Sequence, residues 1–177
     1  TDGSGGEHTT DARIRRCGWA AVHMGPQESQ SDELQAALYG PLPGAKHTVP
    51  RAEIYAAVRV LRRTRGPVVI HTDCKQLADG FHKRDGTLKG PNGDLWTEFW
   101  SAYDEHEGPV HIIKVKAHAE AEHVEKGEIT LQQLRGNHFA DAFAGLGARL
   151  AALATPAVGN VENVQTVDRH TWLVQKR

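Results

Sequence analysis

Residues 48–73, TVPRAEIYAAVRVLRRTRGPVVIHTD, combine an amphipathic helix with a following strand. Apolar side chains recur at helical spacing from Ile54 to Leu61, and Pro50 stands where the first turn of a helix tolerates proline. A Gly-Pro pair ends the helix, and the apolar run 67–73 then predicts a strand that closes on an acid. A helix followed by such a strand is typical of an α/β fold.

The neighbouring segments extend this unit on both sides. Upstream, the end of one strand is expected at Thr1 and Asp2, and two further strands at 17–24 and 34–44 could pair antiparallel. Downstream, the patterns predict helices over 74–84 and 94–107, a strand over 110–118, and loops over 84–94 and 119–136, with room for one helical turn at 130–135. A last helix is expected to start near Asn137. We therefore expect a mixed α/β fold with helices covering a sheet.

The composition is that of one globular domain. The chain has 177 residues, of which 39% are hydrophobic and 24% charged. Residues 1–150 are predicted to form the domain, and residues 151–177 a linker or tail, because 155–177 lack periodicity. The net charge of −1 is unlike the basic surplus that many nucleic-acid-binding proteins carry.

The chain carries few signals of export or membrane insertion. Cys17 and Cys74 are too few for a disulfide framework and indicate a reducing, intracellular compartment, in the nucleus or the cytoplasm. No apolar run approaches the roughly 20 residues that cross a bilayer, and the first residues do not form a secretory signal. We therefore expect no membrane partner.

Four acids occupy similar places in the predicted elements. Asp2 ends a strand before a glycine turn, Glu53 lies early in a helix, Asp73 closes a strand, and Asp141 lies in the last helix. Each alone could be an ordinary turn, cap or surface residue. If they converge, carboxylates ~4 Å apart repel by about 4 kcal/mol at an effective dielectric of about 20, and divalent cations such as Mg²⁺ remove that repulsion.

These acids lie in a series of short motifs that run in order along residues 1–147. The motifs are TDGS (1–4), RAEIYAA with Glu53, HTDCKQLADGF with Asp73, DLW (94–96), KAH (116–118) and GNHFADAFA with Asn137 and Asp141. Their order and spacing resemble those of the ribonuclease H type 1 family, and single motifs of this length would be weak evidence. The resemblance implies an RNase H-like α/β fold: a five-stranded mixed sheet, three antiparallel strands and then two parallel ones, flanked by helices.

The same resemblance implies an activity and a set of metal ligands. The expected function is an endoribonuclease that hydrolyses the RNA strand of RNA–DNA hybrids by a two-metal-ion mechanism. Asp2, Glu53 and Asp73 would hold two Mg²⁺ ions, with Mn²⁺ a possible substitute, and Asp141 would complete the shell of one ion. His118 would assist proton transfer or product release, since an imidazole titrates near pH ~6.5.

Substrate-binding residues follow from the resemblance as well. Backbone groups of Gly3, Ser4 and Gly5 would contact the 2′-hydroxyl groups that distinguish RNA from DNA. The remaining expected contacts to the hybrid come from Lys75, Lys116 and Asn137. For the two lysines the alternative is an ordinary solvated side chain.

Several features depart from the family pattern. Only Thr1 precedes Asp2, so the first strand is expected to be cut short, and upstream residues are expected to raise stability and activity. Val49 and Pro50 stand where many members have polar residues, and 82–94 lacks a basic, Trp-rich protrusion. The segment after His118 is enlarged and acidic. Together these features resemble the RNase H domain of a retrotransposon polyprotein, in which an upstream reverse-transcriptase domain would supply much of the grip on the hybrid.

Two other functions remain open at this point. One is an integrase-like or resolvase-like nuclease that cuts DNA with a similar acid cluster. The glutamate early in the helix and the N-x-x-x-D pattern of the last helix argue against it. The other is a catalytically weak or silent module that binds hybrids. The presence of all four acids and His118 argues against that module.

Overall fold

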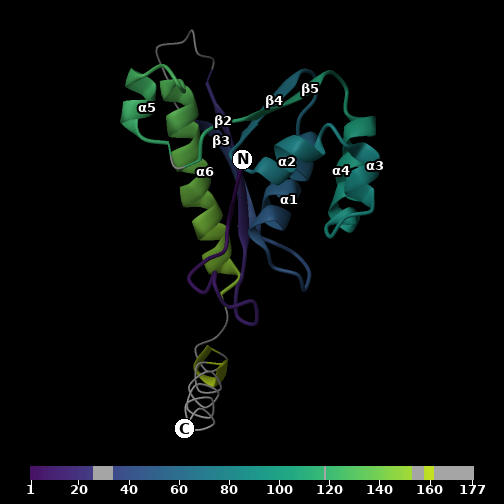
Figure 1. Cartoon of the computed structure of the whole chain (residues 1–177), viewed down its shortest axis with the longest axis vertical. Helices are drawn as coiled ribbons and strands as arrows, with labels where there is room; N and C mark the ends of the chain where they lie inside the picture. Colours follow the sequence, from purple (N-terminus) through teal and green to yellow (C-terminus); the bar gives the residue numbers. More distant parts are fainter. Residues whose placement is uncertain (26–33, 118, 153–157, 162–177) are drawn as a thin grey trace, which may run out of the picture.

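The computed structural model describes residues 1–25, 34–117, 119–152 and 158–161. Strands and helices are mixed along the chain, as expected for a mixed α/β fold (Figure 1). In chain order the elements are β1 (Asp2–Ser4), β2 (Gly18–Met24), β3 (Leu34–Pro41), α1 (Val49–Leu61), β4 (Val68–Thr72), α2 (Lys75–Gly80), α3 (Arg84–Leu88), α4 (Gly93–Glu105), β5 (Val110–Lys114), α5 (Ala121–Glu125) and α6 (Leu131–Leu150). None of the described helices combines the length and apolar character needed to cross a bilayer.

The strands pair as the sequence predicts, three antiparallel and then two parallel. β1, β2 and β3 form an antiparallel sheet, with Asp2 opposite Ala20, while β4 and β5 pair in parallel. The expected single sheet of five strands is wrong in this detail, because the pairing gives one sheet of three strands and one of two. The amino group of Thr1 donates a hydrogen bond of 2.7 Å to the carbonyl of His71, so β1 touches β4 at its very start.

A groove of about 750 Å³ lies between the two sheets, and Thr1 is one of the residues that line it. Residues 21–24 of β2 line one wall and residues 68–71 of β4 line the other. Figure 1 shows β2 and β3 diverging from β4 and β5, with the amino terminus at the point where the two sheets meet. The acids at the ends of β1 and β4 therefore come from two sheets that meet at one point.

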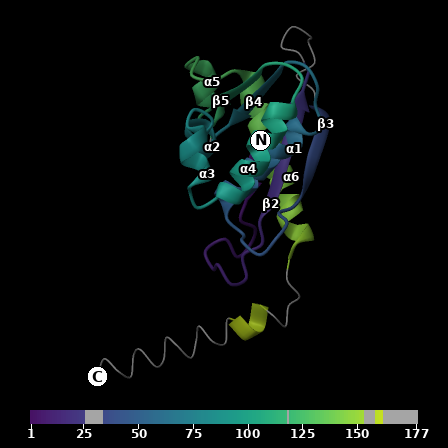
Figure 2. The same cartoon turned by 90° about the vertical axis from the view of Figure 1, so that its right-hand side faces the viewer.

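Helices cover the three-stranded sheet on both faces. α6 packs against β1, β2 and β3, while α1 packs against β1, β2 and α4 on the opposite face (Figures 1 and 2). The close approach of α6 depends on small residues, since a Cβ atom at Gly18 would lie 2.1 Å from the backbone nitrogen of Ala148. This packing brings the middle of α6 alongside β1.

The main core lies between α1, α4 and the β4–β5 sheet. Its fully buried members include Ile54, Val58, Leu77, Trp96 and Phe99. The residues of α1 that the sequence places on one apolar face are among them, so the helical periodicity of 54–61 is confirmed. This core holds α1 against β4, which fixes the helix that carries Glu53.

The last helix begins six residues earlier than predicted, at Leu131 instead of Asn137. Thr130 caps it: the Gln133 backbone N–H donates to the Thr130 hydroxyl at 3.1 Å, and the Thr130 N–H donates to the Gln133 side chain at 2.9 Å. This reciprocal capping satisfies two amide groups that the first turn leaves unpaired. The helical turn expected at 130–135 is therefore the first turn of α6.

Two segments predicted as loops contain short helices, α3 within 84–94 and α5 within 119–136. The α5 segment has a small apolar cluster of its own, formed by Ala119, Ile129 and Leu134 with Val124 packed against it. The prediction of a linker or tail at 151–177 falls mostly outside the described residues.

Candidate metal centre

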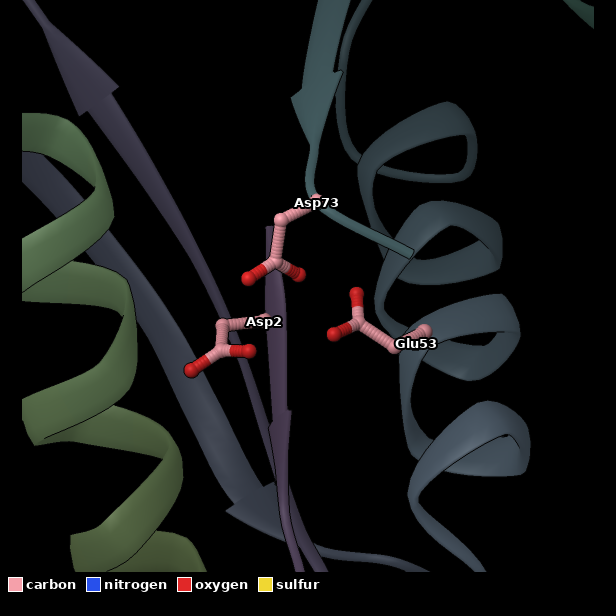
Figure 3. Close-up of side chains that lie close together, drawn as sticks. All are labelled: Asp2, Glu53 and Asp73. Atoms are coloured by element: carbon pink, nitrogen blue, oxygen red, sulfur yellow. The ribbon is translucent and has the colours of Figure 1, made fainter. Parts of the chain in front are cut away.

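Three of the four predicted acids meet at the junction of β1, α1 and β4. Asp2 lies on β1, Glu53 in the first half of α1, and Asp73 directly after β4, and their side chains point toward one another (Figure 3). One carboxylate oxygen from each lies within 4.8 Å of the other two. Residues separated by up to 71 positions in the chain thus form one cluster.

Gly3 allows β1 to approach α1 closely enough for this meeting. A Cβ atom at this position would lie 2.8 Å from the Cβ of Ala52 and 2.9 Å from the carbonyl oxygen of Val49. Any side chain here would push β1 away from the helix and separate Asp2 from Glu53. Gly3 lies within β1 and not in the turn expected after Asp2, so the TDGS motif needs this glycine for packing.

Hydrogen bonds hold both oxygens of the Glu53 carboxylate. The backbone N–H of Gly3 donates to Oε1 at 2.9 Å, and the hydroxyl of Thr72 donates to Oε2 at 3.3 Å. Glu53 is 2% exposed and Thr72 is 0% exposed. The most deeply buried acid of the cluster is thus also the one whose orientation the protein fixes.

The cluster is costly to keep ionised without a cation. Burial raises the pKa of Glu53 well above its ordinary value, and the charge of Asp2 raises it further. Burial also raises the pKa of Asp2 to about 6, with contributions in the same direction from the charges of Asp73 and Asp141. A bound divalent cation would offset both effects.

The donor set fits a hard divalent cation. All three side chains offer carboxylate oxygens, which Mg²⁺ and Mn²⁺ prefer, and no sulfur or imidazole belongs to the described group of three. Asp2 and Asp73 remain partly accessible, so solvent molecules could complete an octahedral shell around an ion. The residues present therefore fit the metal that the sequence led us to expect.

Asp141 approaches the cluster from the other side. It is exposed on α6, and its charge reaches Asp2, but it is not one of the three acids whose oxygens lie within 4.8 Å of one another. Asn137 lies one turn earlier on the same helix and lines the groove between the sheets. α6 thus carries the fourth predicted acid outside the group of three.

The predicted substrate-binding residues of the TDGS segment make local contacts. The N–H of Gly3 is already engaged by Glu53, whereas the hydroxyl of Ser4 accepts a hydrogen bond of 3.3 Å from the N–H of Gly6. Gly5 packs so closely on the loop that a Cβ atom there would lie 1.9 Å from the hydroxyl oxygen of Thr9. These contacts hold the start of the β1–β2 connection, which leaves β1 at the opposite end from Asp2.

Both predicted lysines are exposed and paired with acids. Lys75 lies 3.8 Å from Asp79, and Lys116 lies 2.6 Å from Glu128. Exposed pairs of this kind contribute about 0–1 kcal/mol, so either lysine can exchange its partner for a phosphate at little cost. His118, the remaining predicted member of the site, lies outside the described residues.

Sequence reasoning missed two residues that support the centre. One is Thr72, whose hydroxyl touches Glu53. The other is Arg51, 7% exposed, which binds both carboxylate oxygens of Asp94 at 2.8 and 2.6 Å and so ties the start of α1 to the start of α4. This contact lowers the pKa of Asp94 to about 2. Arg51 belongs to the RAEIYAA motif and Thr72 to the HTDCKQLADGF motif, so the motifs themselves pointed to both residues.

The comparisons with known proteins agree with this arrangement. The RNase H family model matches residues 1–149. A search of curated protein sequences finds no significant match. Similar solved structures include the RNase H domain of prototype foamy virus (PFV), with a TM-score of 0.61 and 19% identity over 84% of this chain and 92% of that chain.

Two further structures extend the likeness. The N-terminal RNase H domain of rv2228c from Mycobacterium tuberculosis has a TM-score of 0.55 and 15% identity, over 85% of this chain and 92% of that chain. The PFV protease–reverse transcriptase has a TM-score of 0.56 and 22% identity, over 83% of this chain but 20% of that chain. At these identities the structures show a shared fold. The family model spans most of the sequence and includes all four predicted acids, so the chain belongs to the RNase H family.

Proposed function

We propose that this protein is a metal-dependent endoribonuclease that hydrolyses the RNA strand of RNA–DNA hybrids. The observation that carries the proposal is the meeting of Asp2, Glu53 and Asp73, from three separate elements, within 4.8 Å in a chain of the RNase H family. Carboxylates buried together at such a cost are typical of a site built to hold cations.

The chain's own residues would divide the work as follows. Asp2, Glu53 and Asp73 would hold the metal ions, and Asp141 would complete the shell of one of them from α6. A pair of Mg²⁺ ions, or Mn²⁺ in their place, supplies Lewis acidity for an in-line phosphoryl displacement. His118 would move a proton in the reaction, because an unperturbed imidazole has a pKa of ~6.5.

Recognition of the hybrid would rest on the surface beside the cluster. Ser4 ends β1 and Gly5 follows it, and their contacts to 2′-hydroxyl groups would distinguish RNA from DNA. Lys75 follows Asp73 by two residues and Lys116 follows β5, so both stand near the expected path of the phosphates. Asn137 on α6 would contact the same strand as Asp141.

The near-neutral charge supports a setting in which other domains help to grip the substrate. The net charge of −1 provides little of the long-range attraction that usually drives nucleic-acid binding. One structure of similar fold is a protease–reverse transcriptase, in which the matching part is 20% of that chain. We propose that this chain serves a reverse-transcribing element of the retrotransposon type, with a polymerase domain raising the local concentration of hybrid.

The direct test uses end-labelled RNA–DNA hybrid, single-stranded RNA and duplex DNA of one sequence, each with Mg²⁺ and with chelator. We expect cleavage of the RNA in the hybrid alone, abolished by chelator and by Asp73→Asn. Asp104→Asn, an equal change of charge at the far end of α4, serves as the matched control and should cleave normally. Cleavage of duplex DNA would favour the integrase-like alternative, and hybrid binding without cleavage would favour the silent module.

A further inference from the structure

Thr72 has a buried hydroxyl that touches the metal centre without belonging to its ligands. The residue ends β4 and is 0% exposed. Its Oγ1 accepts a hydrogen bond of 3.0 Å from the backbone N–H of Cys74 and donates one of 3.3 Å to Oε2 of Glu53. A hydroxyl has a single hydrogen, so the bond from Cys74 leaves that hydrogen for Glu53.

The bond to Cys74 also governs Asp73. Thr72 and Cys74 flank this acid, and the hydrogen bond between them closes a tight turn around it. The direction in which Asp73 leaves the strand therefore depends on the same oxygen that orients Glu53. One hydroxyl is thus tied to two of the three clustered acids, one on α1 and one after β4.

This link opposes the repulsion within the cluster. In the absence of a cation, Glu53 would lower its energy by turning away from Asp2 and Asp73, and the bonds from Gly3 and Thr72 prevent that turn. A carboxylate already held in place binds an ion without the cost of ordering a side chain.

We propose that Thr72 is a positioning residue, whose hydroxyl sets the spacing of Glu53 and Asp73 and thereby the affinity of the centre for divalent cations. The inference rests on the proposed function, since it assumes that these acids hold a metal. A purely structural role makes a different prediction. A buried strand position needs a β-branched side chain of this size, and valine supplies that shape without the hydroxyl.

The test compares Thr72→Val, which keeps the shape, with Thr72→Ser, which keeps the hydroxyl. Mn²⁺ binding is measured by calorimetry on the full chain, and the melting temperature in chelator reports folding. We expect Thr72→Val to raise the Mn²⁺ dissociation constant about 10-fold, as removal of an outer hydrogen-bond partner of a ligand does. Thr72→Ser should bind Mn²⁺ within about 2-fold of the wild type.

Kinetics supply a second readout. If the hydroxyl acts through metal affinity, Thr72→Val should need about 10-fold more Mg²⁺ for half-maximal hybrid cleavage and recover most of its rate at saturating Mg²⁺. A structural defect would lower the rate at every Mg²⁺ concentration.

Three results would overturn the inference. Equal Mn²⁺ affinity in Thr72→Val and the wild type would show that the hydroxyl does not matter. An equal loss in Thr72→Ser would assign the effect to packing of the methyl group. Failure of the wild type itself to bind Mn²⁺ would overturn the proposed function together with this inference, so the two failures are distinguishable.

Discussion

On one side of the acid cluster, Glu53 is 2% exposed and both of its carboxylate oxygens accept hydrogen bonds, whereas on the other side Asp141 lies exposed on α6. The first side is built from β1, α1 and β4, which meet in the protein interior. The second consists of α6 and the segment after β5, where Lys116 pairs with Glu128 at the surface. The cluster therefore has a fixed inner side and an adjustable outer side.

This difference assigns different tasks to the two sides. Groups held rigidly before a ligand arrives raise its affinity, because no side chain has to be ordered on binding. Exposed groups can exchange partners at little cost, which suits contact with a substrate that must enter and leave. We expect changes on the inner side to affect metal binding and changes on the outer side to affect turnover of the hybrid.

The largest expected effect is a difference in cleavage rate between a variant on the inner side and a variant on the outer side. Glu53→Gln removes an inner metal ligand and should lower the rate of hybrid cleavage by roughly 100-fold or more. This loss exceeds the roughly 10- to 100-fold that removal of a ligand's hydrogen-bond partner usually costs. Asp141→Asn removes the outer acid and should cost about 10-fold. Initial rates at saturating Mg²⁺ measure both. A greater loss in Asp141→Asn than in Glu53→Gln would reverse the comparison.

Gly3→Ala tests the close packing on which the inner side depends. The added Cβ would lie 2.8 Å from the Cβ of Ala52, so we expect a loss of about 1–3 kcal/mol in the free energy of unfolding, together with weaker Mn²⁺ binding. Denaturant titration and calorimetry measure the two effects. Gly86→Ala on the exposed helix α3, where the nearest atom is 3.9 Å away, should be neutral or slightly stabilising. Equal behaviour of the two variants would count against the packing argument.

The stability of the metal-free protein should depend on pH through the inner acids. The pKa of Asp2 is raised from 3.8 to about 6, and that of Glu53 is also raised, so the folded chain holds these protons more tightly than the unfolded chain. The contribution of Asp2 to stability is complete below about pH 4 and is lost as the pH rises through about 6. The contribution of Glu53 changes in the same direction, because its pKa is also raised.

Melting temperatures in chelator and in Mg²⁺, from pH 4 to pH 8, measure this dependence. Mg²⁺ should restore stability above pH 6 in the wild type, because the ion binds the folded state. Glu53→Gln should melt higher than the wild type in chelator at pH 7 and gain little from Mg²⁺. A wild type that melts at the same temperature with and without Mg²⁺ at pH 7 would contradict the account.

The smallest expected effect concerns the outer side. Glu128→Gln releases Lys116 from its ion pair and removes a negative charge beside the expected substrate path. We expect hybrid binding at low salt to tighten about 2- to 3-fold, the difference to vanish at high salt, and stability to change by less than about 1 kcal/mol. Fluorescence anisotropy with labelled hybrid measures the affinity. Glu105→Gln, an equal charge change at the end of α4, should leave it unchanged.

The parts of the fold that local patterns specify could be predicted from the sequence. The periodicity of 54–61 and the apolar run 67–73 predicted α1 and β4. The arrangement of three antiparallel and two parallel strands, which the family resemblance implied, is confirmed. The start of α6 was missed because residues 119–136 are mostly polar, although Thr130 and Gln133 cap the helix there. The division into two sheets depends on where β1 meets β4, and no local pattern reports that contact.

The candidate site was predictable in its residue types but not in its geometry. The ordered motifs named Asp2, Glu53, Asp73 and Asp141, yet the inner position of three acids and the outer position of the fourth follow from tertiary packing. Thr72 was missed because a threonine in a strand usually reflects β-propensity alone. Its hydroxyl gains significance when α1 brings Glu53 within reach.

The central claim is that Asp2, Glu53 and Asp73 form a divalent metal centre. The most direct test is anomalous diffraction from crystals of this chain grown with Mn²⁺. The account predicts at least one strong anomalous peak coordinated by carboxylate oxygens of all three residues, and its loss in Glu53→Gln crystals. Well-ordered crystals whose Mn²⁺ peaks lie elsewhere, with none between these three side chains, would contradict it.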